Sequence, residues 1–91
     1  MTVVLEHSGR RFKVTAYHDA IRHDGPALEL AELADDGLGP ALMTILFADD
    51  GAGEAQALLH HSALPLPILT TFMEQVRQEE RRLRGQGAGG G

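Results

Sequence analysis

The sequence predicts an α+β domain in which a five-stranded antiparallel β-meander is followed by one C-terminal amphipathic α-helix packed on one face of the sheet. Three observations support this fold class. Four turn motifs divide the first sixty residues into strand-sized pieces, and in most of these pieces apolar residues alternate with polar ones. After Pro65 the apolar repeat lengthens from two residues to about 3.6, the period of an α-helix.

The chain has room for one domain only. It contains 91 residues, and its last seven are mostly glycine with no apolar anchor. We therefore expect a single α+β domain over residues 1–84 and a flexible Gly-rich tail over residues 85–91. A domain of this length buries a thin core, so association with a second chain is a common route to added stability.

The turns are marked by glycine after a short polar residue. The motif Ala-Asp-Asp-Gly-x-Gly occurs twice, at residues 34–39 and 48–53, and earlier turns are expected at 7–10 and 23–26. Glycine adopts a positive φ without a Cβ clash, and aspartate hydrogen-bonds the backbone two residues further on. The sequence therefore predicts that hairpins join successive strands.

The five expected strands cover residues 2–6, 11–18, 27–33, 41–48 and 54–60. The second strand separates an apolar face from a polar one, which is typical of a strand with one side in solvent. Its apolar face carries Phe12, Val14 and Ala16, and its polar face carries Arg11, Lys13, Thr15 and Tyr17. The third strand likewise alternates Leu28 and Leu30 with Glu29.

The fourth strand is apolar on both faces. Its side chains divide into Leu42 and Leu46 on one face and Met43, Ile45 and Phe47 on the other. A single helix covers one face of a sheet, so the second apolar set needs another cover. We assign Met43, Ile45 and Phe47, or else the opposite set, to the interface of a symmetric homodimer. The alternative is a strongly twisted sheet whose open face is covered by the loop at residues 19–26.

The helix follows Pro65. Its apolar stripe consists of Leu69, Phe72, Met73, Val76 and Leu83, while Gln75, Gln78, Glu79, Arg81 and Arg82 are expected to face solvent. The helix begins either with Pro67 at its first helical position or at Thr71, which would form a capping box with Glu74. Gly85 is expected to end it, after arginines that favour the negative end of the helix dipole.

Composition limits the class of protein. The chain has no cysteine, which excludes disulfides and thiolate zinc sites, and its start lacks the basic and apolar regions of a signal peptide, so we expect a cytoplasmic protein. Lys13 is the only lysine among eight basic residues, and alanine, glycine and leucine abound, a composition typical of high-GC genomes such as those of actinobacteria.

Chemistry-bearing motifs are absent from the sequence. Ser8 and Ser62 are the only serines, and neither lies in a nucleophile elbow. His60 and His61 are adjacent and cannot converge on one ion, and the acidic loop at residues 49–54 lacks the ligand spacing of a calcium loop. We expect a non-catalytic protein with neither cofactor nor metal.

The charges are unevenly distributed. The net charge is −5, yet all eight basic residues lie within residues 10–22 and 77–84, and nine acidic residues occupy the stretch between them. We expect a small binding or regulatory module that acts as a homodimer through protein–protein contacts. Its candidate acidic partner surface comprises Asp35, Asp36, Asp49 and Asp50.

The alternative is a nucleic-acid-binding regulatory protein. A strand meander followed by one helix resembles the repeat unit of Whirly-type and related transcriptional coactivator domains, and the resemblance implies binding of single strands across the sheets of an oligomer. The basic first hairpin and the arginine-rich helix end would then contact phosphates. The candidate residues are Arg10, Arg11, Lys13, Tyr17 and Arg22.

Overall fold

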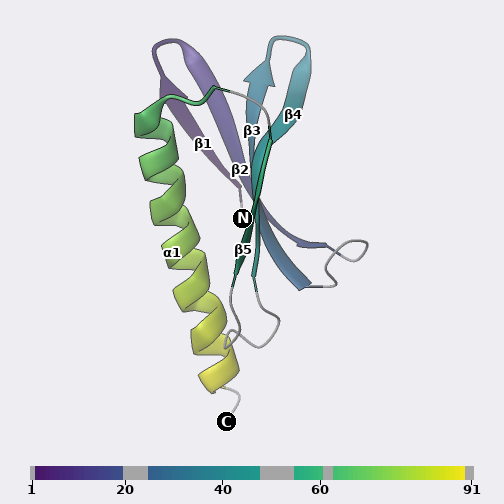
Figure 1. The fold of residues 1–91 in the computed structure, drawn as a ribbon, viewed down its shortest axis with the longest axis vertical. Coiled ribbons are helices and arrows are strands. Elements are labelled where there is room, and N and C mark those ends of the chain that lie inside the picture. Colours follow the sequence, from purple (N-terminus) through teal and green to yellow (C-terminus); the bar gives the residue numbers. More distant parts are fainter. Residues whose placement is uncertain (1, 20–24, 48–54, 61–62, 90–91) are drawn as a thin grey trace.

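The computed structural model describes residues 2–19, 25–47, 55–60 and 63–89, and it confirms the predicted α+β architecture (Figure 1). One antiparallel sheet has its strands in chain order, and a single helix follows them. The elements are β1 (Thr2–His7), β2 (Arg10–Asp19), β3 (Gly25–Ala34), β4 (Gly37–Leu46), β5 (Gln56–Leu59) and α1 (Leu66–Gly89). β5 is shorter than the strand expected at residues 54–60.

Two of the predicted turns form the tips of hairpins. Ser8 and Gly9 both have positive φ, 51° and 78°, which defines the tight turn between β1 and β2. Asp35 and Asp36 turn the chain between β3 and β4, and Gly37 follows them with a φ of 133°. The other two turn motifs, at 23–26 and 48–53, lie partly or wholly outside the described residues.

The pairing of β3 with β4 contains two irregularities. Leu30 pairs with Met43 and Ala31 with Ala41, so Leu42 is an extra residue on β4, and a further register shift follows. At that second shift a Cβ on Gly39 would lie 2.8 Å from the carbonyl oxygen of Glu32, a contact that only glycine avoids. The bulge at Leu42 interrupts the alternation of faces, and Leu42 packs against the same core as Met43.

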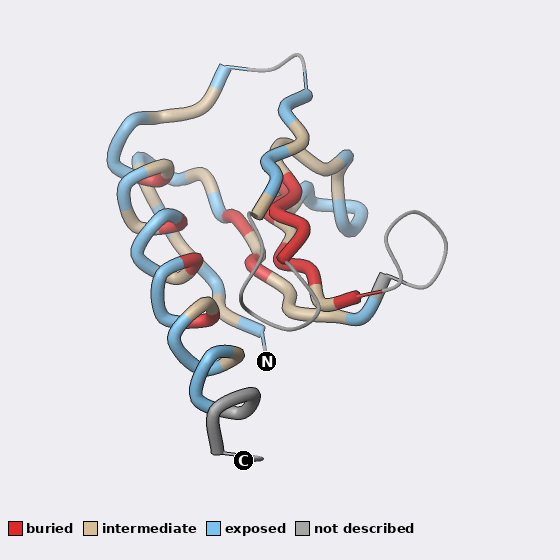
Figure 2. The backbone as a smooth tube through the Cα atoms, turned by 60° about the horizontal axis from the view of Figure 1, so that its bottom comes forward, coloured by how far each residue is buried: buried red, intermediate tan, exposed pale blue. Residues whose placement is uncertain are grey.

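The core lies between α1 and one face of the sheet (Figure 2). Ile45 and Phe47, which we assigned from the sequence to a dimer interface, are buried in this core, and Met43 packs against it. Leu46, on the opposite face of β4, is also buried within the single chain. β4 therefore has its apolar cover without a second copy. The core comprises Phe12, Val14, Leu28, Leu30, Ile45, Phe47, Ile68, Phe72 and Val76.

The helix begins at Leu66, one residue before Pro67, and the carbonyl of Pro65 accepts the N–H groups of Ile68 at 3.0 Å and Leu69 at 3.1 Å. The capping box at Thr71 is wrong, because Thr71 lies inside the helix and its hydroxyl donates to the carbonyl of Pro67 at 3.0 Å.

The helix also ends later than expected. It passes Gly85 and ends at Gly89, so the prediction that Gly85 stops it is wrong. Glycine permits the left-handed stop but does not impose it, since its backbone N–H and C=O can also continue the helical hydrogen bonds. Within the described residues, α1 lacks the apolar stretch that a bilayer-crossing helix needs.

Candidate binding surfaces

The sheet face opposite α1 is polar and charged over β1 and β2, and over β3 and β4 it also carries the buried apolar residues Ala27, Ala31 and Leu46. The register places Glu6 beside Arg11, and Thr15 beside Glu29, on this face. The hydroxyl of Tyr17 reaches the carboxylate of Glu29 at 3.5 Å. The two basic residues of this face, Arg11 and Lys13, are neighbours along β2, with Glu6 beside Arg11 and with Val4 and Ala31 beside Lys13. The described basic surface is therefore limited to these two side chains.

The residues proposed for nucleic-acid binding do not form one surface. Arg10 lies on the α1 side of β2, where its Nε and Nη2 donate to Glu32 Oε2 and Oε1, both at 2.8 Å. Its guanidinium also lies over the ring of Phe12, 5.0 Å from the centroid. Arg11, Lys13 and Tyr17 share the opposite face, and Arg22 lies outside the described residues.

The pair between Arg10 and Glu32 is a charge-assisted, two-point contact. Its hydrogen bond lowers the pKa of Glu32 below its ordinary value and raises that of Arg10. The pair links the tip of the β1–β2 hairpin to β3, and it leaves Arg10 neutralised within the chain. The charge of Arg10 is thereby offset by a carboxylate, which weakens its attraction for phosphate.

Only half of the proposed acidic surface can be placed. Asp35 and Asp36 are exposed at the turn between β3 and β4, whereas Asp49 and Asp50 lie outside the described residues. The described pair is adjacent in the chain and carries two like charges on a hairpin tip. It is available to a basic partner, but it does not form a pocket.

An apolar groove runs along the first half of α1 and has a volume of about 310 Å³. Its described lining is a stripe of α1 at helical spacing, in which Leu66, Leu69 and Met73 are apolar, Thr70 lies among them, and Glu74 and Arg77 carry opposite charges. Leu66 is 70% exposed and Met73 is 40% exposed. In the stripe expected to face the core, Phe72 and Val76 are buried and Leu83 packs against the core, and Ile68 joins this buried line. Leu69 is only half-buried and Met73 is exposed, so a second apolar flank lies beside the core face.

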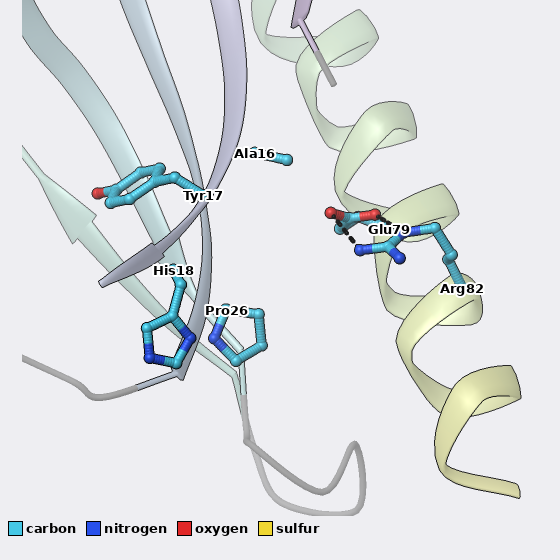
Figure 3. Close-up of a pocket in the computed structure, with 6 residues that line it drawn as sticks. All are labelled: Ala16, Tyr17, His18, Pro26, Glu79 and Arg82. Carbon is cyan, nitrogen blue, oxygen red and sulfur yellow. Dashed lines mark hydrogen bonds and ion pairs between the residues drawn. The ribbon is translucent and has the colours of Figure 1, made fainter. Parts of the chain in front are cut away.

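A second pocket, of about 460 Å³, lies between the second half of α1 and the ends of β2 and β3 (Figure 3). Its lining includes Glu79, whose side chain is only 4% exposed and whose two oxygens accept hydrogen bonds from Nε and Nη2 of Arg82. This hydrogen bond raises the pKa of Arg82. Figure 3 shows Ala16 directed toward the helix and the ring of Tyr17 on the far side of its strand.

The burial of Glu79 corrects the expectation that it faces solvent. The signal was present in the sequence, because Glu79 lies three residues after Val76 and seven after Phe72, on the buried line of the helix. A carboxylate on that line needs a partner, and Arg82, one turn later, supplies it. The charge of this pocket is thus balanced by its own arginine.

Within the residues that the structure describes, no three histidine or acidic side chains gather closely enough to hold a metal ion. Comparisons with protein families, with curated proteins and with solved structures found no match to this chain. The surfaces above are therefore interpreted from their geometry and charge alone.

Proposed function

We propose that this chain is a small, non-catalytic, cytoplasmic binding module that acts as a homodimer and engages a protein partner through the groove on α1. The observation that carries this proposal is the second apolar flank of the helix. The core face of α1 is already buried, yet Leu66 and Met73 remain exposed beside Leu69 on a different side of the same helix. Exposed apolar side chains gathered in a groove mark a surface of contact.

The composition of the groove suits a protein more than a small molecule. Its centre is leucine and methionine, and its edge carries one acidic and one basic residue, Glu74 and Arg77. An apolar centre with a polar rim is the usual arrangement of a protein interface, and methionine adapts readily to a partner's shape. A small-molecule site would enclose its ligand and direct several polar groups inward. Among the described lining residues of this groove, the Thr70 hydroxyl already donates to the carbonyl of Leu66, and Glu74 and Arg77 continue the stripe toward the C-terminal end of the helix.

The acidic turn between β3 and β4 offers the partner a second contact. Asp35 and Asp36 are exposed and unmixed with basic residues on their turn, so a partner with a basic patch would associate faster. The nucleic-acid alternative receives less support, because Arg10 is paired with Glu32 and only Arg11 and Lys13 are basic on the described part of the open sheet face, with Glu6 beside Arg11.

Partner capture with a matched pair of variants tests the proposal. Met73→Glu places a charge in the groove, whereas Gln78→Glu places the same charge on an exposed position of the same helix outside it. Tagged wild-type chain and both variants would be incubated with lysate of the source organism, and bound proteins quantified by mass spectrometry.

We expect one or more proteins to be enriched by the wild type and by Gln78→Glu and to be lost with Met73→Glu. The captured protein, once purified, should bind Met73→Glu at least about tenfold more weakly, which corresponds to about 1.4 kcal/mol. Equal binding of the partner by Met73→Glu and the wild type would exclude the groove as its site.

A further inference from the structure

The outer edge of β1 is a further surface to which a partner can bind. The strand order leaves β1 and β5 at the two sides of the sheet. Among the described residues, β1 forms its ladder with β2 alone. The outer edge of a strand presents backbone N–H and C=O groups to which a further strand can add.

The turn between β1 and β2 determines which backbone groups face outward. His7 pairs with Arg10 across the two-residue turn at Ser8 and Gly9. In such a hairpin the closing pair exchanges both of its hydrogen bonds, and bonded and non-bonded pairs then alternate along the ladder. Val3 and Leu5 therefore bond to β2 as His7 does. The N–H and C=O groups of Thr2, Val4 and Glu6 point outward.

This edge lacks the features that protect edge strands from pairing. Natural edges are short, bulged, or carry proline or lysine. β5 is short, with four residues, whereas β1 has six, pairs with β2 without a bulge and contains neither proline nor lysine. Threonine and valine fill its first half, and these residues favour strands. Its one acidic residue, Glu6, already lies beside Arg11 of β2.

We propose that two copies of this chain pair antiparallel through their β1 edges, about a two-fold axis at Val4. Val4 then lies opposite the partner's Val4, and Thr2 lies opposite the partner's Glu6. All the outward-pointing residues of β1 thereby form bonded pairs, and the two five-stranded sheets join into one sheet of ten strands.

Complete pairing of the outward-pointing residues selects this register over its neighbours. Outward groups can meet only if the strand shifts by steps of two residues, because a single step would also exchange the faces of the sheet. A shift of two residues toward the turn places Glu6 opposite the partner's Val4 and leaves Thr2 without a partner in the strand. A shift of four places the two Glu6 residues directly opposite each other, where like charges are destabilising. A shift in the other direction leaves Glu6 unpaired. With Val4 on the axis, each Glu6 lies between its own Arg11 and the partner's Thr2.

This proposal names the interface of the dimer that forms part of the proposed function, and it rests on the backbone of β1 rather than on the side chains of the groove on α1. It also replaces the contact through β4, whose apolar residues are buried within one chain.

Charge substitution at Val4 tests the axis. Val4 is 55% exposed and lies opposite Lys13 on the same face, so a single folded chain should tolerate Val4→Glu. In the dimer, two such carboxylates would meet across the axis. Leu38→Glu is the matched control, because Leu38 is also 55% exposed but lies on the β3–β4 hairpin. Native mass spectrometry and light scattering would report the mass, and circular dichroism the fold.

We expect the wild type and Leu38→Glu to be dimers, and Val4→Glu and Val4→Lys each to lose the dimer while keeping the fold. Mixing Val4→Glu with Val4→Lys should restore a dimer that contains one copy of each. A monomeric wild type, a dimeric Val4→Glu, or two variants that do not combine would each overturn the proposal.

A measurement on the wild-type chain avoids any question of misfolding. Amide hydrogen exchange should slow at Val4 and Glu6 as the protein concentration rises, whereas Val3 and Leu5 should be protected throughout. Rapid exchange at Val4 and Glu6 in a dimer would place its interface elsewhere. Loss of partner capture with Met73→Glu is measured separately, so failure of the groove and failure of this edge are distinguishable.

Discussion

Arg82 holds the carboxylate of Glu79 in a two-point hydrogen bond at the inner side of α1, with Nη2 donating to Oε2 at 3.1 Å. The two partners differ in environment, because Glu79 is 4% exposed while Arg82 is about half exposed. A buried carboxylate is tolerated only while it is paired, so the half-exposed Arg82 stabilises the buried charge of Glu79.

The first prediction concerns this pair. Arg82→Ala leaves the Glu79 carboxylate buried without its partner, and we expect the free energy of unfolding to fall by about 1–3 kcal/mol. In a chain that already carries Glu79→Met, the same Arg82→Ala change should have little effect. Urea unfolding of the two single variants and the double variant forms the required cycle. Equal losses in both backgrounds would mean that Arg82 acts through something other than Glu79.

The second prediction concerns the pair of Arg10 and Glu32. The hydrogen bond from Arg10 lowers the pKa of Glu32 in the folded chain. The unfolded chain therefore binds more protons at this site, and stability rises with pH there. The stabilisation that this pair gives the folded chain is fully present above pH 4.5, the ordinary pKa of glutamate. It is lost as the pH falls through the lowered pKa of Glu32 in the folded state.

We expect Glu32→Gln to unfold with a weaker pH dependence than the wild type below about pH 5, since the neutral amide does not titrate. Thermal unfolding at several pH values would show this, with Glu74→Gln on the exposed surface of α1 as the comparison. Parallel pH profiles for the wild type and Glu32→Gln would contradict the lowered pKa.

The sequence alone predicts the order of the strands and the helix and, for most strands, which side chains face the core. Glycine-rich turns and alternating side chains are local signals, and Phe12, Val14, Leu28 and Leu30 are buried as their alternation predicts. The faces of β4 could not be assigned in the same way, because both carry apolar residues. Only the position of the helix decides that Ile45 and Phe47 belong to the core.

The candidate sites were harder to predict for a related reason. Arg10 and Arg11 are neighbours in the chain, so alternation sends them to opposite faces of β2, and a cluster in the sequence becomes two separate charges in space. The partner of Arg10 is Glu32, twenty-two residues away, and no local pattern identifies it. The groove on α1 could not be predicted, because the helix packs with a slightly different side toward the sheet than its apolar stripe indicates. Met73 is therefore exposed and Glu79 is buried.

The third prediction tests the nucleic-acid alternative. If Arg11 and Lys13 bound phosphates on the open sheet face, replacing both with alanine would weaken binding of a single-stranded oligonucleotide and lower its salt dependence. We expect the wild type to bind such an oligonucleotide weakly or not at all at physiological ionic strength, because Glu6 and Glu29 lie beside these residues. Fluorescence anisotropy over a salt series would measure this. Tight binding that the double variant abolishes would favour the nucleic-acid function.

The fourth prediction uses two glycines in contrasting settings. Gly85 lies inside α1, and a Cβ there would meet nothing within 4 Å, whereas a Cβ on Gly39 would lie 2.8 Å from the carbonyl of Glu32. Gly85→Ala should stabilise the chain by about 0.5–1 kcal/mol, since alanine loses less conformational freedom on entering a helix. Gly39→Ala should destabilise it, because the bulge in β4 would have to move away from β3. Urea unfolding of both variants tests whether α1 continues past Gly85. A lower free energy of unfolding in Gly85→Ala would mean that Gly85 adopts the left-handed conformation that ends a helix.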